Sequence, residues 1–139
     1  MSASRLLTVP ITLRWSDMDA LGHVNNSVYA TYVEEARLRW LQTVPGGWIT
    51  DAISPVLVAQ HVNFRMPITW PQDIEVELYA GRIGGSSLTL EFRVLAAGDA
   101  NTLFADGHSV MVWTGRDGKS VPLPEHIRAA CLIGADTST

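Results

Sequence analysis

One segment near the start of the chain, residues 28–41, repeats its apolar side chains at the spacing of an α-helix. The repeating positions lie three and four residues apart: Tyr29, Val33, Ala36 and Trp40. This spacing gives a helix one apolar face, which has to be buried against another part of the chain. Polar residues 25–27 are suited to cap the start of the helix, and Pro45-Gly46-Gly47 ends it. The rest of the fold must therefore supply a surface for this helix.

The segments on either side of the helix alternate apolar and polar residues, as half-buried β-strands do. Five strands are predicted, with the ranges Val9–Trp15, Pro55–Arg65, Ile74–Tyr79, Leu88–Leu95 and Leu103–Trp113. Gly84-Gly85-Ser86 predicts a tight hairpin, and Pro124 begins a short C-terminal helix. This order predicts an α+β fold in which the long helix packs on an antiparallel sheet. The open edge of such a sheet favours pairing with a second copy, so we expect a homo-oligomer.

Composition narrows the class of protein. The 139 residues suit one domain and contain no linker or repeat, so residues 1–139 are predicted to form a single domain. A net charge of −4 argues against nucleic-acid binding, which needs a basic surface. The single cysteine, Cys131, and the lack of a signal peptide predict a cytoplasmic location. No apolar run reaches the roughly 18 residues that cross a bilayer, so no membrane span is expected.

The segment between the first strand and the helix, residues 16–29, concentrates chemically useful side chains. It holds two carboxylates, one imidazole and two carboxamides: Asp17, Asp19, His23, Asn25 and Asn26. A helix N-terminus carries free N–H groups and a partial positive charge, so it can polarise a carbonyl and stabilise an oxyanion. A carboxylate beside it can attack that carbonyl or take a proton from water. The segment is therefore suited to acyl-transfer chemistry.

The same segment forms a longer motif. It reads D-x-D-x-x-G-H-V-N-N-x-x-Y from Asp17 to Tyr29, and is followed by Tyr32, Glu35 and Arg37, by Phe64-Arg65-x-Pro67 and by Trp70-Pro71-x-Asp73. These residues resemble the hydroxybenzoyl-CoA thioesterase branch of the hotdog superfamily, and the resemblance covers nearly the whole chain. It implies the hotdog fold, an antiparallel β-sheet wrapped around a long central α-helix. It also implies acyl-CoA thioesterase activity.

The resemblance assigns roles to individual residues. Asp19 takes the family's catalytic place beside the helix N-terminus, as nucleophile or as general base, and His23 is expected to assist it. Asn25 and Asn26 serve as substrate ligands or as helix caps, and Tyr29 and Arg65 are expected to contact the substrate. The run also resembles the catalytic segment of acyl-carrier-protein thioesterases. Those enzymes have an asparagine where this chain has Leu21, a departure that weakens the carrier-protein reading.

Other polar residues are given structural roles. Asp17 is expected to bond its own loop, as aspartates before helices often do. Glu34 and Glu35 offer an alternative carboxylate on the helix, but the nearby arginines favour a solvated or ion-paired face. Cys131 has no evident histidine partner, so a catalytic thiol is not expected. The histidines outside the motif lack metal-ligand spacing, and no metal site is predicted: His61, His108 and His126.

The sequence thus predicts hydrolysis of an acyl-CoA thioester to a free acid and CoA. Neither a metal nor an organic cofactor is expected, since coenzyme A enters as part of the substrate. Four cations are candidates for contacting the CoA phosphates: Arg65, Arg82, Arg116 and Lys119. A hotdog hydratase or dehydratase and a non-catalytic acyl-CoA binding module are the alternatives. The acyl chain, and the choice between homodimer and homotetramer, stay open at this stage.

Overall fold

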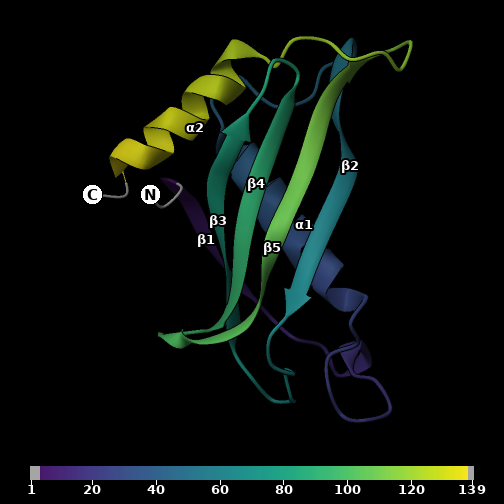
Figure 1. Ribbon diagram of the computed structural model, residues 1–139, viewed down its shortest axis with the longest axis vertical. Coiled ribbons are helices and arrows are strands. Elements are labelled where there is room, and N and C mark those ends of the chain that lie inside the picture. Colours follow the sequence, from purple (N-terminus) through teal and green to yellow (C-terminus); the bar gives the residue numbers. More distant parts are fainter. Residues whose placement is uncertain (1–3, 138–139) are drawn as a thin grey trace.

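The computed structural model describes residues 4–137 of the chain, and the side chains of residues 5–132 (Figure 1). The elements in chain order are β1 (Ser4–Ile11), a short 3-10 helix (Trp15–Asp17), α1 (Val28–Thr43), β2 (Ile53–Phe64), β3 (Ile74–Ile83), β4 (Ser87–Ala96), β5 (Asp99–Gly115) and α2 (Glu125–Thr137). No helix in this described part is both long and apolar enough to cross a membrane.

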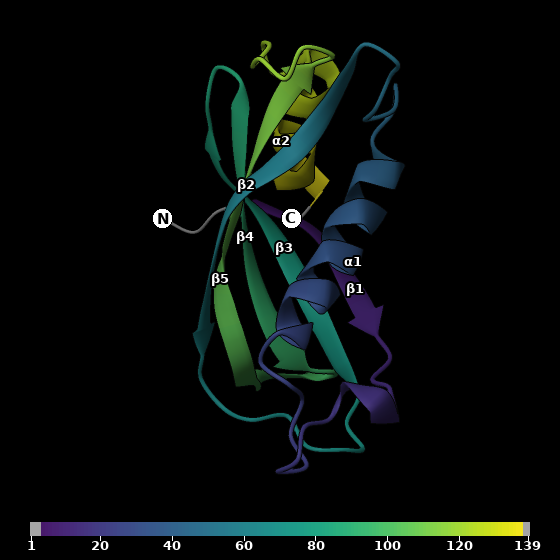
Figure 2. The ribbon, with the colours of Figure 1, turned by 90° about the vertical axis from the view of Figure 1, so that its right-hand side faces the viewer.

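All five strands belong to one antiparallel sheet. Their order across the sheet is β1-β3-β4-β5-β2, so β1 and β2 form its two edges. The sheet curves, and α1 lies along its concave face, as Figure 2 shows from the side. The C-terminal helix α2 contacts β1 and β3. This is the predicted hotdog arrangement, with a central helix of 16 residues.

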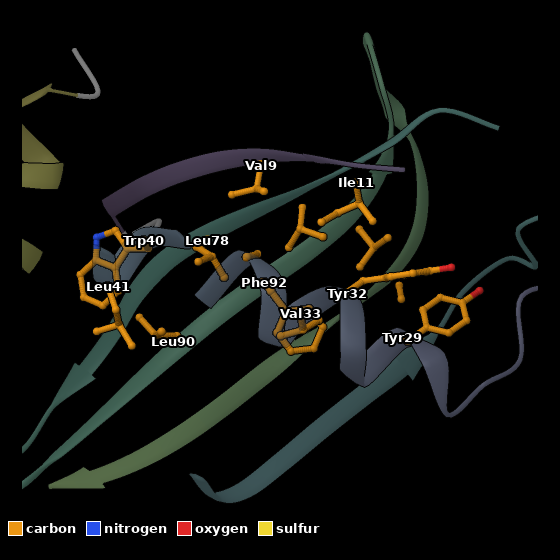
Figure 3. Close-up of a cluster of buried hydrophobic side chains, with 14 of the residues drawn as sticks. Val9, Ile11, Tyr29, Tyr32, Val33, Trp40, Leu41, Leu78, Leu90 and Phe92 are labelled. Carbon is orange, nitrogen blue, oxygen red and sulfur yellow. The ribbon is translucent and has the colours of Figure 1, made fainter. Parts of the chain in front are cut away.

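The apolar face of α1 forms the core together with the concave face of the sheet (Figure 3). The four residues that predicted the helix are at most 3% exposed: Tyr29, Val33, Ala36 and Trp40. They meet strand residues such as Leu78, Leu90 and Phe92, each about 1% exposed. Full burial of one large aliphatic or aromatic side chain is worth roughly 1.5–3 kcal/mol. Contacts of this kind hold α1 in place relative to the strands.

The first strand differs from its prediction. The predicted range was Val9–Trp15, whereas β1 runs from Ser4 to Ile11 and Trp15 begins a 3-10 helix. The reason lies in the partner strand, because Ile11 pairs with Ile74, the first residue of β3. Beyond that pair no ladder partner exists, so residues 12–15 leave the sheet. The alternation that predicted the strand persists as far as Leu13, which is 5% exposed.

The last strand begins earlier than predicted. The predicted range was Leu103–Trp113, but β5 already starts at Asp99, opposite Ala96 of β4. The reversal needs only Ala97 and Gly98, and Gly98 has a φ of +78°, a conformation that glycine adopts without strain. The C-terminal helix is found where expected, with Ile127 and Cys131 buried.

Two groups of connecting segments lie at opposite ends of the sheet (Figure 1). The lower end carries residues 12–27, which lead into α1, and residues 65–73, which join β2 to β3. These two segments are in contact, since Trp15 meets Trp70 edge to face with ring centroids 6.1 Å apart. The upper end carries the hairpin at residues 84–86 and the connection at residues 116–124.

Candidate active site

The loop before α1 folds back on itself at the lower end of the sheet. Met18 forms an isolated bridge with Val24, and the Asp19 N–H donates to the His23 carbonyl at 2.7 Å. The Gly22 N–H donates to the Asp19 carbonyl at 3.1 Å, and Gly22 takes a φ of +78° to make the reversal. This compact loop brings Asp19 and His23 opposite each other.

The two carboxylate oxygens of Asp19 are in different environments. Oδ1 accepts hydrogen bonds from the N–H groups of Leu21 at 2.8 Å and His23 at 3.1 Å. No donor among the described residues bonds Oδ2. The loop therefore holds the carboxylate in one orientation and leaves one oxygen available for a ligand.

A cavity of about 300 Å³ opens beside this carboxylate. Five residues that the sequence assigned to the site line it: Asp19, His23, Asn26, Tyr29 and Arg65. Sequence reasoning did not assign the other lining residues, which are Leu21, Val24, Phe64, Met66 and Pro67. Three of these, Phe64, Met66 and Pro67, belong to the motif Phe64-Arg65-x-Pro67. The motif therefore already indicated this wall of the cavity. The cavity thus joins the pre-helix loop, the first turn of α1 and the end of β2.

Asn25 is the one predicted site residue outside the cavity lining. Its Oδ1 accepts hydrogen bonds from the Ser27 N–H at 3.0 Å and from the Ser27 hydroxyl at 2.9 Å. The Asn25 carbonyl also accepts the Val28 N–H at 2.9 Å. Asn25 therefore shapes the entry into α1, and its role as a substrate ligand stays a prediction.

Aromatic rings form one wall of the cavity. Tyr29 packs edge to face against Phe64, with ring centroids 5.1 Å apart. Burial raises the pKa of the Tyr29 hydroxyl and the nearby Asp19 carboxylate raises it further, although the Ile68 backbone opposes both effects. Tyr29 is therefore a neutral hydrogen-bonding group on the same cavity as Asp19.

Arg65 lies on the rim of the cavity. Its Nη2 contacts Asp106 Oδ1 at 3.0 Å, and half of the Arg65 side chain is exposed. It also lines a larger groove of about 710 Å³ on the convex face of the sheet. The other three candidate cations, Arg82, Arg116 and Lys119, belong to the upper end. Among the four candidates, Arg65 alone adjoins Asp19.

The other candidate groups lie elsewhere. Asp17 does not line the cavity and is 1% exposed. Glu35 pairs with Arg39 at 2.8 Å, and Glu34 faces a separate hollow beside β2. Burial raises the pKa of the Cys131 thiol to about 11, which keeps it protonated and unreactive at neutral pH. In the described part of the chain, no three His, Cys, Asp or Glu side chains gather as metal ligands would.

The model of the thioesterase-like superfamily matches residues 13–131 of this chain, a span that contains the loop, the cavity and most of the sheet. The chain belongs to the thioesterase-like superfamily. No curated protein matches it. The membership agrees with the resemblance on which the site residues were assigned.

Solved structures of other proteins share the fold of this thioesterase-like chain. A candidate thioesterase from Pseudomonas aeruginosa is 40% identical, with a TM-score of 0.82 over 91% of this chain and 98% of the other. A candidate acyl-CoA thioesterase from Xanthomonas campestris is 47% identical, with a TM-score of 0.77 over 85% and 98%. A thioesterase from Thermus thermophilus, solved with coenzyme A and zinc, is 32% identical, with a TM-score of 0.82 over 96% of both chains.

Proposed function

We propose that this chain hydrolyses acyl-CoA thioesters, with Asp19 as the catalytic carboxylate. The observation that carries the proposal is the Asp19 side chain, held by two backbone N–H groups through one oxygen while the other is free at the cavity. An immobilised carboxylate with a free oxygen is what nucleophilic or general-base catalysis requires. The coenzyme A in the name of the Thermus relative supports CoA as the carrier of the acyl group.

The reaction consumes water and breaks the bond between the acyl carbon and sulfur. As a nucleophile, Asp19 attacks the acyl carbon and expels the CoA thiolate, and water then hydrolyses the mixed anhydride to the free acid. As a general base, Asp19 takes a proton from water, which attacks the acyl carbon directly. In both routes the N-terminal turn of α1 stabilises the negative oxygen of the tetrahedral intermediate. His23 and Tyr29 are polar groups on the same cavity that orient the thioester or the water.

Release of CoA thiol across a panel of acyl-CoAs tests the proposal. Wild type is expected to release thiol from at least one acyl class, and Asp19→Asn is expected to lose this turnover while keeping the fold. Unchanged turnover in Asp19→Asn would refute the assigned carboxylate. Tight binding of acyl-CoA with no thiol release would instead favour a binding module, and hydration of enoyl-CoA would favour a hydratase.

Isotope incorporation can identify the nucleophilic route. After many turnovers in ¹⁸O-water, the nucleophilic route with water attacking the aspartyl carbonyl leaves ¹⁸O in the Asp19 carboxylate. Mass spectrometry of the peptide that contains Asp19 would detect the label. Label in Asp19 therefore identifies the nucleophilic route, whereas the general-base route, like anhydride hydrolysis at the acyl carbonyl, delivers the label to the product acid alone.

The proposed enzyme works as a homo-oligomer formed along β2. This edge strand exposes a continuous apolar run, in which Val56, Leu57 and Val58 are between 42% and 56% exposed. Its outer backbone groups have no strand partner in the described sheet. Phe64, at the end of β2, lines the cavity, so a second copy along this edge would approach the site. Sedimentation of wild type against Val58→Glu tests this assembly, and a Val58→Glu protein of unchanged mass would refute it.

A further inference from the structure

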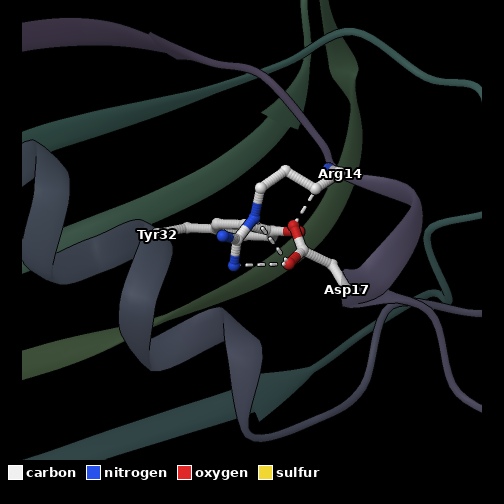
Figure 4. A network of polar contacts seen from close by, with 3 residues as sticks. All are labelled: Arg14, Asp17 and Tyr32. Carbon is white, nitrogen blue, oxygen red and sulfur yellow. Dashed lines mark hydrogen bonds and ion pairs between the residues drawn. The ribbon is translucent and has the colours of Figure 1, made fainter.

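Asp17 is a buried carboxylate that the proposed reaction does not use. Four groups donate hydrogen bonds to its carboxylate, and Figure 4 shows the cluster that Asp17 forms with Arg14 and Tyr32. Oδ2 accepts the Arg14 N–H at 3.0 Å and the Tyr32 hydroxyl at 2.8 Å. Oδ1 accepts Nε and Nη2 of Arg14 at 3.1 and 3.0 Å. Arg14 is largely exposed, with 70% of its side chain in solvent, so the charge is buried only at Asp17.

The cluster joins three parts of the chain. Arg14 belongs to the segment that leaves β1, Asp17 ends the 3-10 helix, and Tyr32 is on α1. Tyr32 lies three positions after Tyr29, so the two rings sit on neighbouring turns of the same helical face. Tyr29 lines the cavity, whereas Asp17 and Tyr32 do not. The contact from Asp17 to Tyr32 therefore links the pre-helix segment to the helix just behind the site.

Asp17 also fixes the base of the loop that carries Asp19. The Asp17 carbonyl accepts the Asn25 N–H at 2.9 Å, and the next residue, Met18, bridges to Val24. Both ends of the loop 18–24 are thus tied to Asp17 and the residue after it. A displacement of Asp17 would move the loop as a unit relative to the first turn of α1.

A purely structural anchor would not need a buried charge at this position. Desolvating a carboxylate is unfavourable, and apolar residues of similar volume often stabilise a fold as well or better. What a carboxylate adds is direction, since its two oxygens accept donors at defined angles. Catalysis depends on such direction, because a misplacement of about 1 Å can cost on the order of 100-fold in rate.

We infer that Asp17, fixed by Arg14 and Tyr32, is a positioning residue that sets the place of Asp19 relative to the N-terminus of α1. The inference rests on the proposed catalytic role of Asp19. Asp17 acts through the loop and does not touch the substrate. Its loss therefore lowers kcat and leaves KM for the acyl-CoA nearly unchanged.

Tyr32→Phe tests the inference with little disturbance of packing, because it removes one hydroxyl and leaves the Arg14 contacts in place. The matched control is Tyr79→Phe, since the Tyr79 hydroxyl donates to Glu77 Oε1 at the same distance of 2.8 Å, on the convex face. Both variants are expected to lose a few degrees of melting temperature. Tyr32→Phe is expected to lower kcat about tenfold with KM within about twofold. Tyr79→Phe is expected to keep the wild-type kcat.

Several results would overturn the inference. They are an unchanged kcat in Tyr32→Phe, an equal loss of kcat in both variants, or an effect confined to KM. A second variant, Asp17→Asn, keeps the side-chain volume and is expected to lower kcat further, and a folded Asp17→Asn with wild-type kcat would also contradict it. The pH profile of kcat should keep its shape in Tyr32→Phe, since the ionising groups at the cavity are intact. The Asp19→Asn experiment separately decides whether the thioesterase proposal itself holds.

Discussion

Each end of the sheet contains an aspartate turn with a glycine of positive φ, but the two turns have different surroundings. At the lower end, Asp19 accepts the N–H of the residue two positions later at 2.8 Å, and Gly22 has a φ of +78°. At the upper end, Asp117 accepts the N–H two positions later at 3.0 Å, and Gly118 has a φ of +81°. An aspartate turn with a left-handed glycine is thus present at both ends.

Only the lower turn meets a helix N-terminus and a cavity with aromatic walls. The upper turn connects β5 to the segment before α2, and neither Asp117 nor Gly118 lines the hollow found at that end. The two ends are roughly 35–40 Å apart, given about 3.3 Å per residue over the 12 residues of β2. The comparison shows that an aspartate turn becomes a candidate site through its neighbours, while the turn itself serves folding equally well at both ends.

The largest expected difference between the ends is in turnover. Asp19→Asn is expected to reduce kcat by at least about 100-fold, the usual scale for removing a general base. Asp117→Asn is expected to keep wild-type kcat, because it lies at the far end. Thiol-release kinetics of both variants, with circular dichroism as the folding control, would measure this. Equal losses in the two variants would remove the distinction between the ends.

The two glycines sharpen the comparison, because their replacement strains both turns alike. A Cβ added at Gly22 or at Gly118 would have no atom within 4 Å, so the positive φ is the whole effect of alanine there. Each Gly→Ala variant is expected to lose about 1–2 kcal/mol of unfolding free energy. Gly22→Ala alone is expected to lower kcat, about tenfold, since it shifts the loop that carries Asp19. Urea unfolding and steady-state kinetics together separate the two effects.

The cations offer a smaller test. Arg65→Gln is expected to raise KM for acyl-CoA a few-fold, since the phosphates of CoA lose a charged contact at the cavity rim. Arg82→Gln, at the upper end, is expected to leave KM unchanged. The Arg65 effect should also shrink at high salt, which screens exposed charges. A rise in KM for Arg82→Gln instead would place the CoA phosphates at the opposite end from Asp19.

The smallest expected effect is on acid stability at the lower end. Burial raises the pKa of Asp17, but the hydrogen bonds from Tyr32 and Arg14 outweigh burial, so its pKa lies below the ordinary value of 3.8. The ionised carboxylate therefore stabilises the fold above about pH 4, and this stabilisation is lost as the pH falls through the lowered pKa. The stability gap between wild type and Asp17→Asn should narrow in urea unfolding as the pH falls below about 4. A gap that widens on acidification would contradict the lowered pKa.

Much of the fold could be predicted because its signals are local. The helical spacing from Tyr29 to Trp40 and the alternation in β3 and β4 each follow from burial on one face, which sequence records directly. The end of β1 could not be predicted, because it depends on where β3 begins, at Ile74, far along the chain. The early start of β5 had the same origin, since a two-residue turn sets the register with β4.

The candidate site also has a part that the sequence could predict and a part that it could not. Asp19, His23, Asn26 and Tyr29 are close in sequence, so the motif alone placed them together. Phe64 ends β2 and Met66 follows it, so the approach of this wall to the loop depends on tertiary contacts such as that of Tyr29 with Phe64. Asn25 could cap the helix or bind the substrate, and the two roles differ only in the direction of its side-chain amide. The sequence does not specify this direction.

The contact between Trp15 and Trp70 gives the lower end an optical signal of its own. Trp15 is 71% exposed and Trp70 is 43% exposed, whereas Trp48 is partly buried and Trp40 and Trp113 lie in the core at 3% exposure or less. A water-soluble quencher such as acrylamide therefore first quenches the fluorescence of Trp15 and Trp70, beside the Asp19 loop. Ligand binding or loop displacement at this end can be followed by fluorescence in the unmodified protein, without a label.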